Sequence, residues 1–227
     1  MDILSNPDFL ARIATGLYLT VILAFASWFI AMASGILLAV VRIVANRAVD
    51  AVVALWIEYQ RNVPVLVHIF AWYFGISTLL PYVIQDWMNA HGGDVMFAAL
   101  AIGLYYGAYV CEDIRSGYRS IPTGQYEAAR TIGLTFWQST QYVMLPQALR
   151  ASTPALVSRA ILLLKSTSIA MVIGVMELTY QTKEIYNETF RVFAIFSVAT
   201  IIYFLLSLII IALGNVIERF YAVRVTS

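Results

Sequence analysis

The chain has 227 residues, of which 61% are hydrophobic and 12% are charged, and its formal net charge is +1. A soluble domain carries about 25% charged residues, so these few charges cannot cover a water-soluble protein and much of the surface must face lipid. The near-neutral charge gives no support for nucleic-acid binding. A single cysteine, Cys111, excludes an intrachain disulfide. The acidic start of the chain lacks the basic segment of a signal peptide, so we expect the first apolar run to remain in the mature protein.

Five apolar runs are long enough to cross a bilayer, which takes about 20 residues in a helix. They cover residues 13–44, 49–73, 95–116, 153–175 and 192–217. Residues 117–152 form the one long polar segment between them. We therefore expect an all-α membrane protein with five transmembrane helices and a single transmembrane domain over residues 1–227.

Basic residues near the ends of the spans set the orientation, because lysine and arginine are retained on the cytoplasmic side. With the N-terminus outside, three basic residues lie outside, and these are Arg12, Lys183 and Arg191. The cytoplasmic side then holds Arg42, Arg47, Arg115, Arg119, Arg130, Arg150, Arg219 and Arg224. The pattern predicts a periplasmic N-terminus, a cytoplasmic C-terminus and a cytoplasmic segment 117–152.

The segment 117–152 carries the signals of two short helices joined by a turn. Thr123 is placed to cap a helix over residues 125–132, and Gly133 is typical of a position just past a helix end. A capping box opens a second helix at Thr135, and we expect Pro146 to end it. On these signals alone, an amphipathic surface loop is the favoured interpretation of the segment.

The residues of this segment also form a recognisable motif. Glu127-Ala128-Ala129, then Gly133 and then Leu145-Pro146 at this spacing resemble the EAA signature of ABC importer permeases. The resemblance implies a coupling helix that docks into a groove of a cytoplasmic ATPase, with Gly124 and Arg130 in the same contact segment. Residues 61–67, 108–115, 145–150 and 165–168 resemble the polar amino-acid branch of these permeases, and the stretches around Arg61 and Cys111 resemble its glutamate/aspartate members.

This resemblance implies the type I ABC importer permease fold, with alternating access in the bacterial inner membrane. The substrate would be a polar amino acid. The resemblance favours glutamate or aspartate, with glutamine or basic amino acids as alternatives. The implied partners are a second permease subunit (the same or homologous), two cytoplasmic ATPase subunits and a periplasmic solute-binding protein. The permease does no covalent chemistry, so we expect no catalytic residue and no metal. The sequence has no P-loop, so ATP and Mg would be bound by the partner ATPase and this chain would hold no cofactor.

Ionisable and polar residues within the predicted spans are candidates for the substrate pathway, because charges at membrane depth usually face a cavity or a partner. In the second span, Glu58, Arg61, Val65, His68 and Trp72 recur at helical spacing, and Pro64 frees the backbone carbonyl of Gln60. The candidates are Arg61, Asn62, His68, Glu112, Lys165, Ser166, Thr167 and Ser168.

Other interpretations of these residues stay open. Arg61 and Glu112 could form a buried ion pair that holds two helices together, and His68 could be an interior histidine with its hydrogen bonds satisfied. A membrane-embedded enzyme is a further alternative, but the chain has two histidines, His68 and His91, and no H-E-x-x-H motif. A self-contained channel or secondary transporter would leave the EAA-like segment unexplained.

Overall fold

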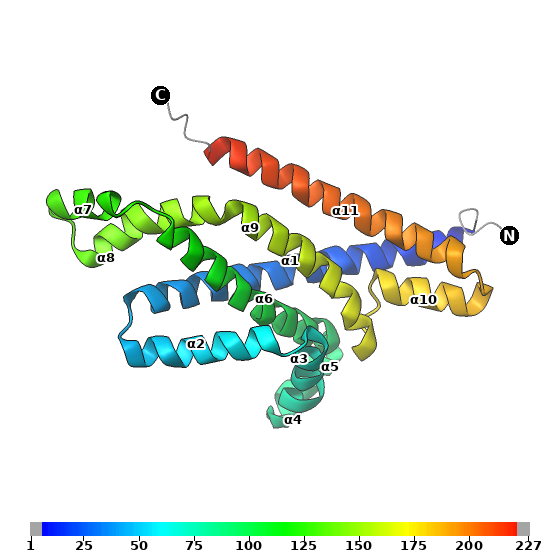
Figure 1. Ribbon diagram of the computed structural model, residues 1–227. Helices are drawn as coiled ribbons and strands as arrows, with labels where there is room; N and C mark the ends of the chain where they lie inside the picture. The colour runs from blue at the N-terminus through cyan, green and yellow to red at the C-terminus, as the bar shows by residue number, and fades with distance from the viewer. Residues whose placement is uncertain (1–5, 222–227) are drawn as a thin grey trace.

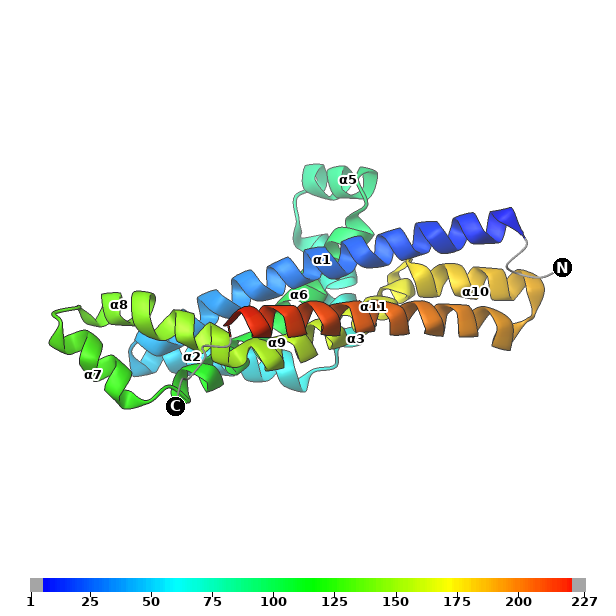
Figure 2. The same cartoon turned by 90° about the horizontal axis from the view of Figure 1, so that it is seen from above.

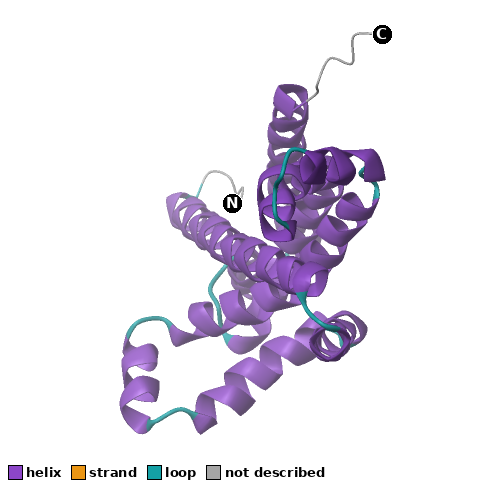
Figure 3. Ribbon diagram, turned by 90° about the vertical axis from the view of Figure 1, so that its left-hand side faces the viewer, coloured by secondary structure: helices purple, strands orange, loops and turns teal. Residues whose placement is uncertain are grey.

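The computed structural model describes residues 6–221, and this part of the chain is built of helices and connecting loops without a strand (Figure 3). Four long helical segments have the length and mean hydropathy of membrane spans: Pro7–Val44, Gly93–Arg119, Phe136–Ile173 and Val192–Arg219. They correspond to α1 (Pro7–Val44), α6 (Gly93–Arg119), α9 (Leu145–Ser166) and α11 (Val192–Tyr221), and Figure 1 shows them running along the length of the molecule. Arg224, which enters the predicted orientation, lies outside the described residues.

Shorter helices connect these four. Between α1 and α6 lie α2 (Arg47–Asn62), α3 (Val65–Phe70), the π-helical turn η2 (Ala71–Ile76), α4 (Ser77–Leu79) and α5 (Tyr82–Ala90). Between α6 and α9 lie α7 (Thr123–Thr131), α8 (Phe136–Ser139) and the π-helical turn η3 (Thr140–Met144), and after α9 come the 3-10 turn η4 (Thr167–Ile173) and α10 (Leu178–Thr189). Figures 1 and 2 place α7 and α8 at one end of the molecule and α10 at the other, beside the start of α1.

The second predicted span is a broken helix rather than one continuous run. Arg47–Asn62 and Val65–Leu79 meet at an angle of 106°, and together they pass as a fifth span. Val63 is extended at the break, and Pro64 supplies no backbone N–H to continue the helix. The prediction of one helical face carrying Glu58, Arg61, Val65, His68 and Trp72 is therefore wrong, because the chain changes direction after Arg61.

The fourth predicted span is longer than expected at its start. The helix runs from Phe136 to Ile173, so the prediction that Pro146 ends a helix is wrong. The π-helical turn η3 immediately precedes Leu145 and Pro146. Such a turn changes the hydrogen-bond register where proline removes a donor, so the helix continues through this position.

Close packing of α1 against α6 forms the centre of the fold. A Cβ atom added at Gly103 would lie 2.6 Å from Cβ of Ile30, and one added at Gly107 would lie 2.2 Å from Oγ of Ser34. Small residues at such positions let two membrane helices approach closely. The buried residues around this contact, including Leu23, join α1 and α6 to α9 in one apolar core.

Helix α10 is attached to α11 through a buried carboxylate, that of Glu177, which was not among the residues predicted from the sequence. Glu177 caps α10, and its side chain accepts hydrogen bonds from the backbone N–H groups of Thr179 (2.8 Å) and Tyr180 (2.9 Å) and from the Tyr203 hydroxyl (2.9 Å). Burial raises the pKa of the Glu177 carboxyl above its ordinary value, against the opposing effect of these hydrogen bonds. The cap fixes the direction in which α10 leaves the end of the preceding turn.

Candidate functional site

A charged cleft lies where the end of α2 meets α6 and α9, and we refer to it as the charged chamber. Its volume is about 320 Å³. Seven side chains line it: Arg61, Tyr109, Glu112, Asp113, Ser116, Arg119 and Arg159. The structure thus brings the predicted residues Arg61 and Glu112 to the same cleft.

The guanidinium groups of Arg61 and Arg159 both lie against the ring of Tyr109. The Arg61 Cζ is 5.4 Å from the centre of the Tyr109 ring, and the Arg159 Cζ is 4.8 Å from it. The Tyr109 hydroxyl donates a hydrogen bond of 3.2 Å to the backbone carbonyl of Arg61. The helix breaks at Pro64, so this carbonyl belongs to the last turn of α2, whose oxygens lack helical partners. Cation–π attraction and this hydrogen bond together position both arginines over the ring.

Asp113 and Arg159 form a two-pronged ion pair that the sequence analysis missed. The Arg159 Nε donates to Asp113 Oδ2 at 2.8 Å, and its Nη2 donates to Oδ1 at 3.3 Å. The pair links α6 to α9, and the Asp113 side chain is 13% exposed. A signal for Arg159 was present in the sequence, because it is an arginine inside the predicted fourth span, where ionisable residues usually mark a pathway or a partner.

Glu112 pairs with arginines other than the predicted one. It accepts a short hydrogen bond from Nη1 of Arg42 and another from Arg115 at 3.0 Å. Arg42 also contacts Asp50 at 2.7 Å, which ties α1, α2 and α6 together. The predicted ion pair between Arg61 and Glu112 is therefore wrong.

Arg61 itself has a weak partner. Its Nη1 lies 3.7 Å from Glu58, whose side chain is 61% exposed, and such an exposed pair contributes little.

The charges of this region leave the chamber positive. Five arginines meet four carboxylates: Arg42, Arg61, Arg115, Arg119 and Arg159 against Asp50, Glu58, Glu112 and Asp113. Both carboxylates that line the chamber already have arginine partners within hydrogen-bonding distance. The groups left to meet an incoming molecule are thus the donor-rich faces of arginines, which bind carboxylates.

Asn62 and His68 lie near the chamber but do not line it. The Asn62 amide donates to the carbonyl of Glu58 at 2.7 Å and to its carboxylate at 2.9 Å. His68 is buried, with its ring 5.2 Å from that of Tyr59 and 5.6 Å from that of Tyr105. The Nε2 atom of His68 is buried without a hydrogen-bond partner among the described residues.

The predicted residues 165–168 lie where α9 passes into η4, and none of them lines the chamber. The Ser166 hydroxyl is 2.7 Å from the Tyr106 hydroxyl, whereas Thr167 and Ser168 donate to carbonyls of their own helix. Lys165 is exposed and forms no ion pair with a described residue.

A second candidate site is the turn formed by α7 and α8, which we call the elbow. Gly133 has a φ of +89°, so the prediction that it stops the first helix is confirmed. The predicted capping box is also confirmed: the Thr135 hydroxyl accepts from the N–H of Gln138, whose side chain accepts from the N–H of Thr135. The prediction for Thr123 is wrong, because the N-cap is Pro122 and Thr123 is the first residue of the helix.

The elbow presents an exposed surface of mixed character at the end of the molecule (Figure 2). Glu127 and Ala128 are exposed, whereas Ala129 is buried against the rest of the elbow. Ile132 is 77% and Trp137 is 50% exposed. Arg130 braces the turn by donating to the carbonyl of Leu134 at 2.6 Å. A short, braced helix with small and apolar exposed residues is suited to docking in a groove of a partner protein.

The other predicted elbow residues also have defined places. Gly124 is exposed, with nothing within 4 Å of an added Cβ, and Leu145 and Pro146 begin α9 at the base of the elbow. Within residues 6–221, no group of three or more histidine, cysteine or acidic side chains could hold a metal ion.

Comparisons with known proteins agree on one family. The family described as "Binding-protein-dependent transport system inner membrane component" matches residues 31–223. The glutamate/aspartate import permease protein GltJ of Escherichia coli K12 is 33% identical over 218 residues, which cover 94% of this chain and 89% of that protein. The histidine/lysine/arginine/ornithine transport system permease protein HisM of Salmonella typhimurium is 30% identical over 214 residues, covering 94% and 91% of the two chains.

Solved structures show the same likeness. A crystal structure of an amino acid ABC transporter with histidines has a chain that is 31% identical, with a TM-score of 0.79 over 96% of this chain and 98% of that one. An inward-facing structure of the MetNI methionine ABC transporter has a chain with a TM-score of 0.72 at 20% identity, a likeness of fold. These comparisons confirm the predicted all-helical fold.

Proposed function

The chain belongs to the family of binding-protein-dependent transport system inner membrane components, and from that premise we propose that it carries an acidic amino acid, glutamate or aspartate, across the bacterial inner membrane. Family membership makes it the translocation subunit of an ABC importer and not an enzyme. The relatives are named as amino-acid permeases, which supports an amino acid as the substrate.

The charge of the chamber is the observation that supports an acidic substrate. Glu112 and Asp113 are held by arginines, so neither is free to receive a cationic side chain without breaking an existing pair. Arg61 and Arg159 flank Tyr109 and offer guanidinium donors to a carboxylate. A basic amino acid, as the name of HisM indicates for that relative, would need the opposite arrangement.

Every amino acid has an α-carboxylate, which Arg61 could hold whatever the side chain. The acidic substrate is distinguished by its second carboxylate, for which Arg119 and Arg159 also line the chamber. Asn62, His68 and Lys165 with Ser166, Thr167 and Ser168 are proposed as parts of the path beyond the chamber.

The elbow is proposed as the contact with the ATPase. Glu127, Ala128, Ala129 and the exposed Ile132 support this, because they form a braced and accessible helix tip. In this arrangement the elbow and the C-terminus are cytoplasmic and the N-terminus is periplasmic. The subunit would pair with a second permease, and ATP with Mg would be bound by two partner ATPases, while a periplasmic binding protein delivers the amino acid.

Transport then requires two states of the complex. Closure of the ATPases on ATP would draw the elbows of the two permease subunits together and switch the path between inward-facing and outward-facing states. The ion pair between Asp113 and Arg159 joins α6, which precedes the elbow, to α9, which follows it. A movement of the elbow would therefore reach both sides of the chamber.

The Arg61→Gln variant tests the proposed substrate site. We expect ATP-dependent uptake of labelled glutamate by the reconstituted complex to fall by about tenfold or more, since a charged hydrogen bond to the substrate is lost. Arg47→Gln is the matched control, because Arg47 is an exposed arginine at the other end of the same helix. Normal uptake by Arg61→Gln, or equal loss in both variants, would refute the assignment. An Arg61→Gln complex that fails to assemble would instead indicate a structural role.

A further inference from the structure

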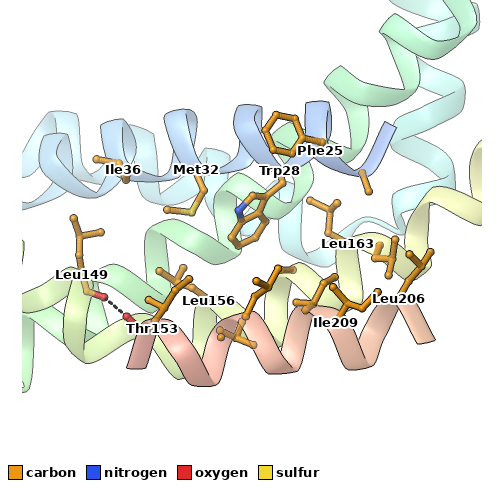
Figure 4. A pocket seen from close by; sticks show the side chains of 18 of the residues that line it. Phe25, Trp28, Met32, Ile36, Leu149, Thr153, Leu156, Leu163, Leu206 and Ile209 are labelled. Atoms are coloured by element: carbon orange, nitrogen blue, oxygen red, sulfur yellow. Dashed lines mark hydrogen bonds between the residues drawn. The ribbon is translucent and has the colours of Figure 1, made fainter. Parts of the chain in front are cut away.

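A second cavity, on a different face of the protein from the chamber, lies between α1, α9 and α11, and we refer to it as the apolar groove. Its volume is about 750 Å³. Figure 4 shows Trp28 of α1 projecting toward α9 and α11, with Leu156 and Leu163 of α9 and Ile209 of α11 around it. The three helices all belong to membrane spans, so the groove lies at the depth of lipid acyl chains.

The residues that line the groove provide few hydrogen-bonding groups for water molecules. The polar lining residues are Thr153 and Arg150, apart from the indole N–H of Trp28. The Thr153 hydroxyl already donates to the carbonyl of Leu149 at 3.1 Å. At about 30 Å³ per water molecule, the volume would correspond to roughly 25 waters with few hydrogen-bond partners. An apolar occupant is therefore strongly favoured.

The two faces of α9 separate the groove from the translocation path. Val157 and Leu164 line the groove, whereas Arg159, which lines the chamber, lies roughly 140–160° around the helix from both, at about 100° per residue. The groove consequently faces away from the polar path and is accessible from the bilayer.

One end of the groove has two arginines and one glutamate close by, Arg150, Arg219 and Glu218, which together leave one positive charge. Pro146, Arg150 and Ile217 line this end, near the elbow, and Arg150 is exposed. Arg219 follows two residues after Ile217 and is also exposed. In the proposed orientation this end lies at the cytoplasmic leaflet, where anionic lipid headgroups attract arginines.

We propose that the apolar groove binds an anionic phospholipid of the cytoplasmic leaflet, with one acyl chain beside Trp28 and the phosphate near Arg150. The acyl chain fills an apolar space, and the headgroup matches the charge at its end. The bound lipid joins α1 and α11 across α9 and so becomes part of the wall behind the translocation path.

Native mass spectrometry of the delipidated full complex tests this site, with phosphatidylglycerol and phosphatidylcholine as the added lipids. We expect the complex to retain phosphatidylglycerol in preference to phosphatidylcholine, at one lipid for each copy of this chain. Ala160→Trp fills the groove and should abolish retention. Ala212→Trp is the control, because Ala212 is an exposed alanine of α11 that does not line the groove. Equal retention by the two tryptophan variants would overturn the proposal.

The headgroup contact has a separate test. Arg150→Gln should reduce the preference for phosphatidylglycerol over phosphatidylcholine by about fivefold, and Arg47→Gln should leave it unchanged. An unchanged preference in Arg150→Gln would overturn the assignment of the headgroup.

A fluorescence measurement keeps the proposal testable if Ala160→Trp fails to fold. A full-length chain that retains Trp28 as its single tryptophan is titrated, in the assembled complex, with phosphatidylglycerol brominated in its acyl chains. We expect quenching that saturates near one lipid per chain. Absence of quenching would overturn the proposal and would indicate that another subunit, such as a second copy of this chain, covers the groove.

Discussion

At the scale of single residues, the ion pair between Asp113 and Arg159, which was not predicted from the sequence, is the direct side-chain link between α6 and α9 at the chamber. Their two hydrogen bonds, at 2.8 and 3.3 Å, hold α6 to α9 at the point where Tyr109 is covered by two guanidinium groups. The pair is mostly shielded from water, so loss of one partner leaves a poorly solvated charge. Arg159 therefore has both a structural role and a place in the chamber.

This arrangement predicts strong coupling between the two side chains. Asp113→Asn and Arg159→Gln should each lower the free energy of unfolding by about 1.5–3 kcal/mol, and the double variant should cost clearly less than the sum of the two. Denaturation of the purified complex in detergent measures this. Glu188→Gln is the control, because its pair with Arg12 is exposed and should contribute about 0.2–1 kcal/mol. Additive losses in the double variant would show that the two residues act independently.

At the scale of the elements, the attachment of α10 depends on the protonation of Glu177. The folded-state pKa of Glu177 is raised by burial, so the folded protein holds this proton up to a higher pH than the unfolded chain does. The stabilisation from protonated Glu177 is present at pH values below the ordinary pKa of about 4.5 and is lost as the pH rises through the folded-state pKa.

A comparison with a neutral cap isolates this effect from the other carboxyl groups. The melting temperature of Glu177→Gln, relative to the natural chain, should rise as the pH increases from about 4.5 to neutrality, since glutamine cannot ionise. The control is Thr182→Ser on the same helix, which changes no ionisable group, so its difference should stay constant. A constant difference for Glu177→Gln as well would contradict the effect of burial on this carboxyl.

The elbow is the element whose proposed role is simplest to perturb. Glu127→Lys reverses a charge on the exposed side of α7 and should reduce uptake by about tenfold or more, while insertion and basal ATP hydrolysis persist, because a reversed charge at a docking contact costs several kcal/mol. Asp86→Lys, a reversal of an exposed charge on α5 in the outward region of the proposed orientation, should transport normally. Unimpaired uptake by Glu127→Lys would remove the elbow from the coupling pathway.

At the scale of the whole molecule, apolar length alone predicted the helical fold, because any bilayer-spanning helix needs such a run. Local signals also predicted the turn at Gly133 and the capping box at Thr135, since these depend on neighbouring residues only. The 106° break at Pro64 and the continuation through Pro146 could not be told apart from sequence. Proline weakens a helix at both positions, and the surrounding packing decides which helix bends.

The sequence was enough to predict that charged residues such as Arg61 and Glu112 are important, but not all of their ion-pair partners. Arg61 and Glu112 were recognisable as charges at membrane depth, and the structure places both in one cleft. Two of the observed pairs, Arg61 with Glu58 and Glu112 with Arg115, are three residues apart on one helix and could have been proposed from its periodicity. The pair of Glu112 with Arg42 depends on how two helices meet. Periodicity within a single helix cannot supply that information. The same limit explains why Asp113 was not linked to Arg159, 46 residues further along the chain.

Uptake by the reconstituted complex, with its ATPase and binding protein in proteoliposomes, tests the central claim most directly. A panel of labelled glutamate, aspartate, glutamine, arginine and histidine is supplied on the side of the binding protein, with ATP on the other side. The positive chamber predicts ATP-dependent accumulation of glutamate and aspartate and little of arginine or histidine. Accumulation of arginine or histidine, with none of glutamate or aspartate, would contradict the proposed substrate.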